Sequence, residues 1–214
     1  MNYNASSSSY GNPMAKLMLT FFFALIVSGV GMFIGTMLPT AARIPLIILE
    51  LALLIGMMFL RRRTSIGYPL MYAFMLVSGA TLQFTLSYYI ASMGSSIVIQ
   101  TVGVAVLVYA GLAIYASRTK EDFRFLHGFL FASLIGLILI GLMQFIFPFD
   151  GAMETFYAGF GLLIFMGYTL YDFNRMAKEG FDESEIPLMV VNIYLDLINI
   201  VLFALRFVKS LTED

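Results

Sequence analysis

The chain has 214 residues, of which 60% are hydrophobic and 12% are Asp, Glu, Lys or Arg. Soluble domains carry about 25% charged and about 45–50% apolar residues, so this excess of apolar residues indicates an apolar solvent. The net charge of −1 offers no basic surface, and we expect no nucleic-acid partner. The absence of cysteine excludes disulfides, thiolate chemistry and most structural zinc sites.

In chain order, residues 1–13 are rich in Ser, Asn, Tyr and Gly, and we expect a disordered tail followed by one transmembrane domain over residues 14–214. A spanning helix needs roughly 20 mostly apolar residues. Seven segments are long enough: about 16–38, 44–60, 67–90, 96–117, 123–147, 152–176 and, the more polar one, 186–208. The predicted fold class is an all-α integral membrane protein with seven transmembrane helices, the polar seventh being central and shielded from lipid.

Several features of these spans have a simple packing interpretation. Gly31 and Gly35 have the GxxxG spacing that can bring two membrane helices close together. Because the chain contains 18 glycines, ordinary packing is the simpler explanation of this spacing. The 15 Met and 21 Phe are most simply core and lipid-facing bulk.

The distribution of Lys and Arg near the span ends predicts the orientation, because cytoplasmic loops carry an excess of these residues. With seven spans, the two sides are unequal: Lys16, Arg61, Arg62, Arg63, Arg118, Lys120, Arg124, Arg175 and Lys178 against Arg43, Arg206 and Lys209. The N-terminus is therefore expected in the cytoplasm and the C-terminus outside a cell membrane. A re-entrant last segment would return Arg206 and Lys209 to the inside, but its length favours spanning.

Three acidic residues, Glu50, Asp172 and Asp196, interrupt apolar segments. An aspartate at the centre of a membrane helix costs about 2.5–3.5 kcal/mol, so such residues usually face a cavity or a partner. The last two spans are joined by a short polar link, residues 178–185, and should run antiparallel. Asp172 and Asp196 are equidistant from residue 184 in this link, which predicts that they lie at similar depth in the cytoplasmic half.

Two neighbouring carboxylates of low solvation cannot both ionise easily, so they titrate as a unit and suit a proton sensor near neutral pH. When deprotonated, the same oxygens suit a low-affinity Ca²⁺ site. The simpler alternative is that each aspartate separately caps or hydrogen-bonds a neighbouring helix. Arg61, at the cytoplasmic end of the second span, either reaches a carboxylate or anchors the helix at the membrane surface. Glu50, roughly 16 Å deeper than Arg61 along the helix, is a candidate to line the same cavity.

The sequence around both aspartates resembles the transmembrane Bax inhibitor motif family. The similar segments are residues 161–172, Gly-Leu-Leu-Ile-Phe-Met-Gly-Tyr-Thr-Leu-Tyr-Asp, and residues 192–199, Asn-Ile-Tyr-Leu-Asp-Leu-Ile-Asn. The resemblance extends over nearly the whole chain, although Phe173 and Asn174 stand where many relatives have Thr-Gln. It implies a seven-helix fold and a pH-sensitive Ca²⁺ leak. It also implies that Asp172 and Asp196 form the family's aspartate pair, Arg61 its latch and Glu50 its second-span acid.

The leading hypothesis is therefore a non-enzymatic calcium leak channel, with Ca²⁺, protons and the lipid bilayer as partners and with no cofactor. In this hypothesis ionised Asp172 holds Arg61 and keeps a gate shut. A proton-coupled cation exchanger using the same pair is an alternative, and a regulator of other membrane proteins is another. An intramembrane aspartyl protease matches Tyr171-Asp172, but the second aspartate lacks the Gly-x-Gly-Asp context of those enzymes.

Overall fold

The computed structural model describes residues 13–60, 64–144 and 146–212, and this part of the chain is helical with no strand. Its elements are α1 (Pro13–Met37), η1 (Thr40–Ala42), α2 (Arg43–Leu60), α3 (Thr64–Met93), α4 (Ser95–Arg118), α5 (Leu126–Met143), α6 (Gly151–Glu179), η2 (Glu183–Glu185) and α7 (Ile186–Thr212). The all-α fold with seven long helices is thus confirmed. The predicted tail lies outside the described residues except for Pro13, which begins α1.

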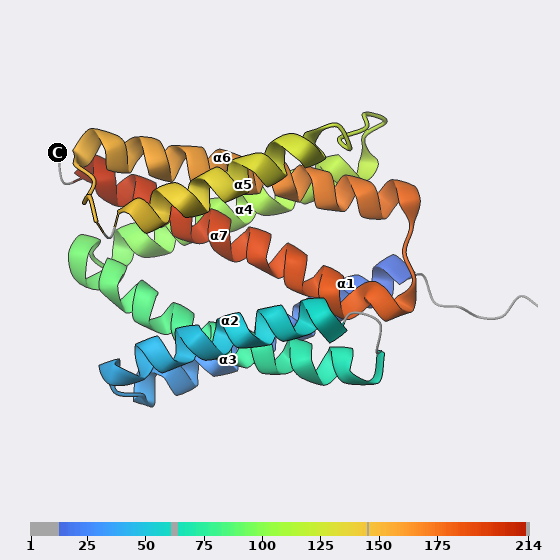
Figure 1. Ribbon diagram of the computed structural model, residues 1–214, viewed down its shortest axis with the longest axis horizontal. Coiled ribbons are helices and arrows are strands. Elements are labelled where there is room, and N and C mark those ends of the chain that lie inside the picture. The colour runs from blue at the N-terminus through green and yellow to red at the C-terminus, as the bar shows by residue number, and fades with distance from the viewer. Residues whose placement is uncertain (1–12, 61–63, 145, 213–214) are drawn as a thin grey trace, which may run out of the picture.

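Six of these helices, α1 to α5 and α7, are long and apolar enough to cross a membrane. The sequence suggested that the last segment is the more polar one, yet α6 is the helix that falls short in apolar composition, because it carries charged residues at both ends and Asp172 between them. At 29 residues, α6 is nevertheless long enough to span. The start of α1 and the end of α7 lie at opposite ends of the bundle, as an odd number of crossings requires (Figure 1).

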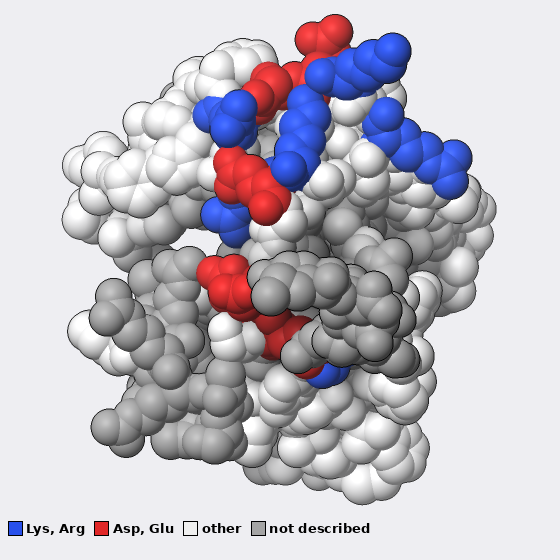
Figure 2. Space-filling model, turned by 90° about the vertical axis from the view of Figure 1, so that its right-hand side faces the viewer, with Lys and Arg blue, Asp and Glu red and all other residues white. Residues whose placement is uncertain are grey.

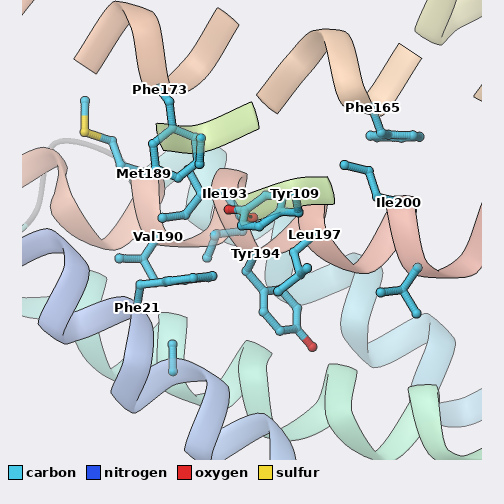
Figure 3. Packing of buried hydrophobic residues seen from close by; sticks show 14 of the residues in the cluster. Phe21, Tyr109, Phe165, Phe173, Met189, Val190, Ile193, Tyr194, Leu197 and Ile200 are labelled. Carbon is cyan, nitrogen blue, oxygen red and sulfur yellow. Dashed lines mark hydrogen bonds between the residues drawn. The ribbon is translucent and has the colours of Figure 1, made fainter. Parts of the chain in front are cut away.

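Helix α7 is the centre of the bundle, as predicted. It contacts α1 and α3 on one side and α4 and α6 on the other (Figure 1). Ile193 and Tyr194 are fully buried, and apolar side chains leave α7 toward α1, α4 and α6 (Figure 3). A helix that is apolar nearly all round is stable only when neighbours or lipid cover every face. Because α7 is one continuous helix of 27 residues, about 40 Å long, it is long enough to cross a membrane.

Two tyrosine hydroxyls tie α7 to its neighbours. Tyr194 donates a hydrogen bond of 3.2 Å to Ser78 of α3, and its oxygen lies 2.8 Å from the hydroxyl oxygen of Ser28 of α1. Tyr109 of α4 donates a bond of 2.8 Å to the backbone oxygen of Ile193. Since the bilayer interior supplies no water, these bonds satisfy polar groups that would otherwise be costly to bury.

Helices α1 and α3 approach one another so closely that glycine is required at the contact. A Cβ atom on Gly31 would lie 2.1 Å from the backbone oxygen of Leu76, and one on Gly79 would lie 2.0 Å from the backbone oxygen of Ser28. Gly35 belongs to the same contact, since its Cβ would come within 2.8 Å of the backbone oxygen of Ala80. The expectation of ordinary packing for the GxxxG spacing is therefore wrong, because backbone rather than side-chain atoms meet there.

This contact predicts that Gly31→Ala destabilises the protein by about 1–3 kcal/mol, because the added methyl group has to displace backbone. Gly29→Ala is the matched control on the same helix, since a Cβ at Gly29 meets nothing within 4 Å. Thermal unfolding in detergent measures both variants. A melting temperature for Gly31→Ala equal to that of Gly29→Ala would contradict the described contact.

Charged side chains gather at the end of the bundle where α1 begins and α6 ends, mainly over the connection between α4 and α5 (Figure 2). The buried Asn174 of α6 anchors this connection. Its side-chain oxygen accepts a 3.0 Å bond from the backbone N–H of Phe123, and its amide donates 3.0 Å bonds to the backbone oxygens of Ala116 and Glu121. The position where relatives have a Thr-Gln pair thus retains a hydrogen-bonding role.

We predict that Asn174→Leu costs about 1–3 kcal/mol and loosens the connection, because three backbone groups lose their partner in a buried setting. Hydrogen–deuterium exchange of residues 119–125 should accelerate in this variant. Gln100→Leu is the control, since the exposed Gln100 amide bonds only Ser96 of its own helix. Unchanged exchange in Asn174→Leu would mean that other contacts hold the connection.

Candidate functional site

Asp172 of α6 and Asp196 of α7 lie in the interior of the bundle. Asp172 is only 8% exposed and Asp196 only 5%. The two helices are antiparallel neighbours, and the carboxylates are close enough to repel one another electrostatically. The structure thus brings together the two residues that the sequence placed at similar depth.

The surroundings of Asp196 leave its charge poorly compensated. Its Oδ2 atom is buried and has no hydrogen-bond partner among the described residues. The hydroxyl of Tyr109 lies near both carboxylates, but it donates its hydrogen bond to the backbone oxygen of Ile193 instead. A buried carboxylate oxygen without a donor is unfavourable, and a proton or a cation would relieve this cost.

Asp172 has positively charged or polar neighbours on its own side of the pair. Arg175, one helical turn further along α6, and His127 at the start of α5 both attract its carboxylate. The Arg175 guanidinium lies 5.8 Å from the ring centre of Tyr171, and the His127 ring lies 5.4 Å from the same ring. The two aspartates therefore differ. The negative charge of Asp172 is partly compensated by its neighbours, whereas that of Asp196 requires a proton or a cation that enters the site.

The other two predicted residues are placed differently. Arg61 lies outside the described residues, so its latch role remains a prediction. Glu50 is partly buried on α2 and interacts with the hydroxyl of Tyr194, which faces α1 and α3. Within the described ranges, no three His, Asp or Glu side chains form a group that could hold a metal ion. The role of Glu50 as an acid lining the cation path stays a prediction.

A second polar group, which sequence reasoning missed, lies toward the other end of α7. Arg206 donates to both carboxylate oxygens of Glu154 on α6, at 2.5 and 2.8 Å, and to the side-chain oxygen of Gln144 at 2.7 Å. Gln144 in turn donates a 3.1 Å bond to Glu154. We call these three residues the Arg206 clamp. Glu154 and Arg206 are equidistant from residue 180, so the reasoning used for the aspartates would have paired them.

The exposed ion pair in the α4–α5 connection is not suited to sensing pH near neutrality. Arg124 donates three side-chain hydrogen bonds to Asp122, at 2.6, 2.8 and 3.0 Å. These bonds lower the pKa of Asp122 to about 2. Asp122 is therefore ionised throughout the neutral range, so any neutral-range response has to come from other groups.

Comparison with known proteins places the chain among membrane proteins of one family. The family model described as "Inhibitor of apoptosis-promoting Bax1" matches residues 10–213. Bax inhibitor 1 of Schizosaccharomyces pombe is 32% identical over 152 residues, which cover 69% of this chain and 55% of that protein. An uncharacterized protein of Helicobacter pylori is 28% identical over 197 residues, covering 90% and 84%.

A plant relative, Protein LIFEGUARD 3 of Arabidopsis thaliana, is 30% identical over 182 residues, covering 84% of this chain and 71% of that protein. The chain spans about half the length of some curated relatives it matches, including Bax inhibitor 1 of the yeast. The family match nevertheless extends over all seven helices and both polar groups. The chain therefore belongs to the Bax inhibitor family of multi-pass membrane proteins.

Proposed function

We propose that this protein is a pH-sensitive calcium leak channel in which Asp172 and Asp196 form the sensor and the cation site. The observation that carries this proposal is a pair of buried carboxylates on adjacent helices, one of which has an oxygen without a described donor. Burying two like charges side by side is unfavourable unless a proton or a cation compensates them. Family membership supports the membrane fold, and the ion chemistry rests on this pair.

The pair offers two mutually exclusive ways of compensation. A shared proton removes one negative charge, whereas Ca²⁺ binds to carboxylate oxygens that have lost their protons. Protons and Ca²⁺ therefore compete, and acidification lowers the occupancy of the site by Ca²⁺. In a leak, Ca²⁺ passes through the site, so the ion is cargo rather than a permanent cofactor.

Arg61 completes the proposal as a latch at the end of α2 that we orient toward the cytoplasm. Ionised Asp172 attracts the guanidinium and favours a closed state, and protonation of the pair weakens that attraction. Arg175 and His127 already lie near Asp172, so the latch competes with local positive charge. Glu50 contributes negative potential from the α1–α3 side of α7 rather than a ligand to the pair.

A proton-coupled cation exchanger is the second candidate, because the same pair accommodates either protons or a cation. The two functions differ in stoichiometry: an exchanger requires a counter-ion for every cation moved, whereas a leak follows the cation gradient alone. Recording Ca²⁺ entry and luminal pH together in vesicles with clamped membrane potential distinguishes them, because an exchanger has to move protons out as Ca²⁺ enters. Ca²⁺ entry without an opposite movement of protons supports the leak.

The proposal predicts that Asp172→Asn and Asp196→Asn each remove the pH response of Ca²⁺ flux near neutral pH, because one carboxylate alone cannot share a proton. Purified protein in liposomes with an internal calcium dye provides the measurement. Asp150→Asn is the matched control, since Asp150 caps the exposed start of α6 and asparagine caps equally well.

Two results would contradict the proposal. The absence of Ca²⁺ flux at every pH in liposomes that contain the wild-type protein would exclude a leak. Variants at both aspartates that retain the wild-type flux and the wild-type pH response would exclude this pair as the sensor.

A further inference from the structure

Two cavities lie side by side along the C-terminal half of α7. The first, of about 280 Å³, is lined by Thr85 and Tyr89 of α3 and by Asn199, Leu202, Phe203 and Arg206 of α7. The second, of about 240 Å³, is lined by Tyr89 and Arg206 again and by Gln144, Glu154 and Lys209 among others. Since Arg206 and Tyr89 line both cavities, they form the boundary between them.

These cavities continue the line of the buried aspartate pair. Asp196, Asn199, Phe203 and Arg206 follow one another at spacings of three, four and three residues, which places them on one face of α7. Arg206 lies ten residues after Asp196, roughly 15 Å along the helix. The lining of the first cavity includes Asn199, one turn from Asp196, and the lining of the second includes Lys209 and Ser210 near the end of α7.

The Arg206 clamp holds the cationic group at this boundary in a fixed place. Glu154 and Gln144 accept the N–H bonds of the guanidinium, and its face lies 4.4 Å from the ring centre of Tyr157. The side chains of Arg206 and Glu154 are only 23% and 25% exposed. Glu154 and Arg206 together carry no net charge, and the positively charged Lys209 lines the second cavity beside them. Without Glu154, two positive groups would therefore act on this poorly hydrated passage.

We propose that the two cavities form an entrance of the cation path at the end of the bundle where α7 ends, and that Glu154 admits cations by neutralising Arg206. This inference rests on the proposed leak function and adds to it the residue that sets cation admission. Charged side chains at a constriction set ion selectivity in channels, and an unpaired guanidinium excludes cations. The bidentate carboxylate and Gln144 keep Arg206 from acting in this way.

The flux experiment removes the negative charge of Glu154 and then restores the charge balance by removing the positive charge of Arg206 as well. Glu154→Gln leaves Arg206 uncompensated, so Ca²⁺ flux should fall several-fold. The double variant Glu154→Gln with Arg206→Gln removes both charges, so flux should return toward the wild-type value. Asp150→Asn removes one negative charge a turn away from Glu154 without touching the clamp, and it should leave flux unchanged.

Chemical labelling tests the same cavities without relying on flux. The chain contains no cysteine, so single cysteines can be introduced without background. Thr85→Cys and Asn199→Cys should react with a charged, membrane-impermeant methanethiosulfonate, whereas Val104→Cys, exposed on the bundle exterior, should resist it. When the same cysteine variants also carry Glu154→Gln, a cationic reagent should react more slowly relative to an anionic reagent of similar size.

The outcomes separate the inference from the function on which it rests. If wild-type protein carries Ca²⁺ but Glu154→Gln carries it equally well, the inference fails and the leak stands. If Thr85→Cys and Asn199→Cys resist the reagents as Val104→Cys does, the cavities are not a water-filled entrance. If wild-type protein carries no Ca²⁺, the leak fails and this inference fails with it.

Discussion

Two carboxylates, Asp172 and Asp196, are buried on neighbouring helices of the bundle. A single charge in hydrocarbon is costly, and two neighbouring like charges are more so, unless a proton or a cation compensates them. An inert helical bundle would gain stability by replacing both with apolar residues. The pair suits a protein with two states, one in which a proton compensates these negative charges and one in which a cation does.

The remainder of the bundle makes this burial tolerable. Helix α7 is held on one side by Tyr194 with Ser28 and Ser78, and on the other by Tyr109 with the backbone of Ile193. Because these bonds lie within one turn of Asp196, the carboxylate sits on a rigid element. Helices α1 and α3 pack closely against one another through their glycines, and both also contact α7. At the far end, the Arg206 clamp joins α6 and α7 with opposite charges, so the same helix pair is strained by repulsion at one level and stabilised by attraction at another.

Much of this was predictable from the sequence, because long apolar segments and short links determine an up-and-down helical bundle. The meeting of Asp172 and Asp196 followed from their equal distance to one link. The same reasoning applies to Glu154 and Arg206, but Arg206 was used only in the count of positive charges that predicts orientation. The roles of Gly31 and Asn174 depend on how closely two helices approach and on where a connection folds back, and neither quantity is encoded in hydropathy. The weaker apolar character of α6 than of α7 was not predicted, because the polar residues of α7 are conspicuous within an otherwise strongly apolar helix.

A carboxylate pair that binds either protons or a cation has to release protons when the cation binds. This release can be measured by adding Ca²⁺ to the purified protein in weakly buffered solution near neutral pH. Wild-type protein should release protons, and the double variant Asp172→Asn with Asp196→Asn should release none. Equal proton release from both proteins, or none from the wild type, would mean that this pair does not exchange protons for Ca²⁺.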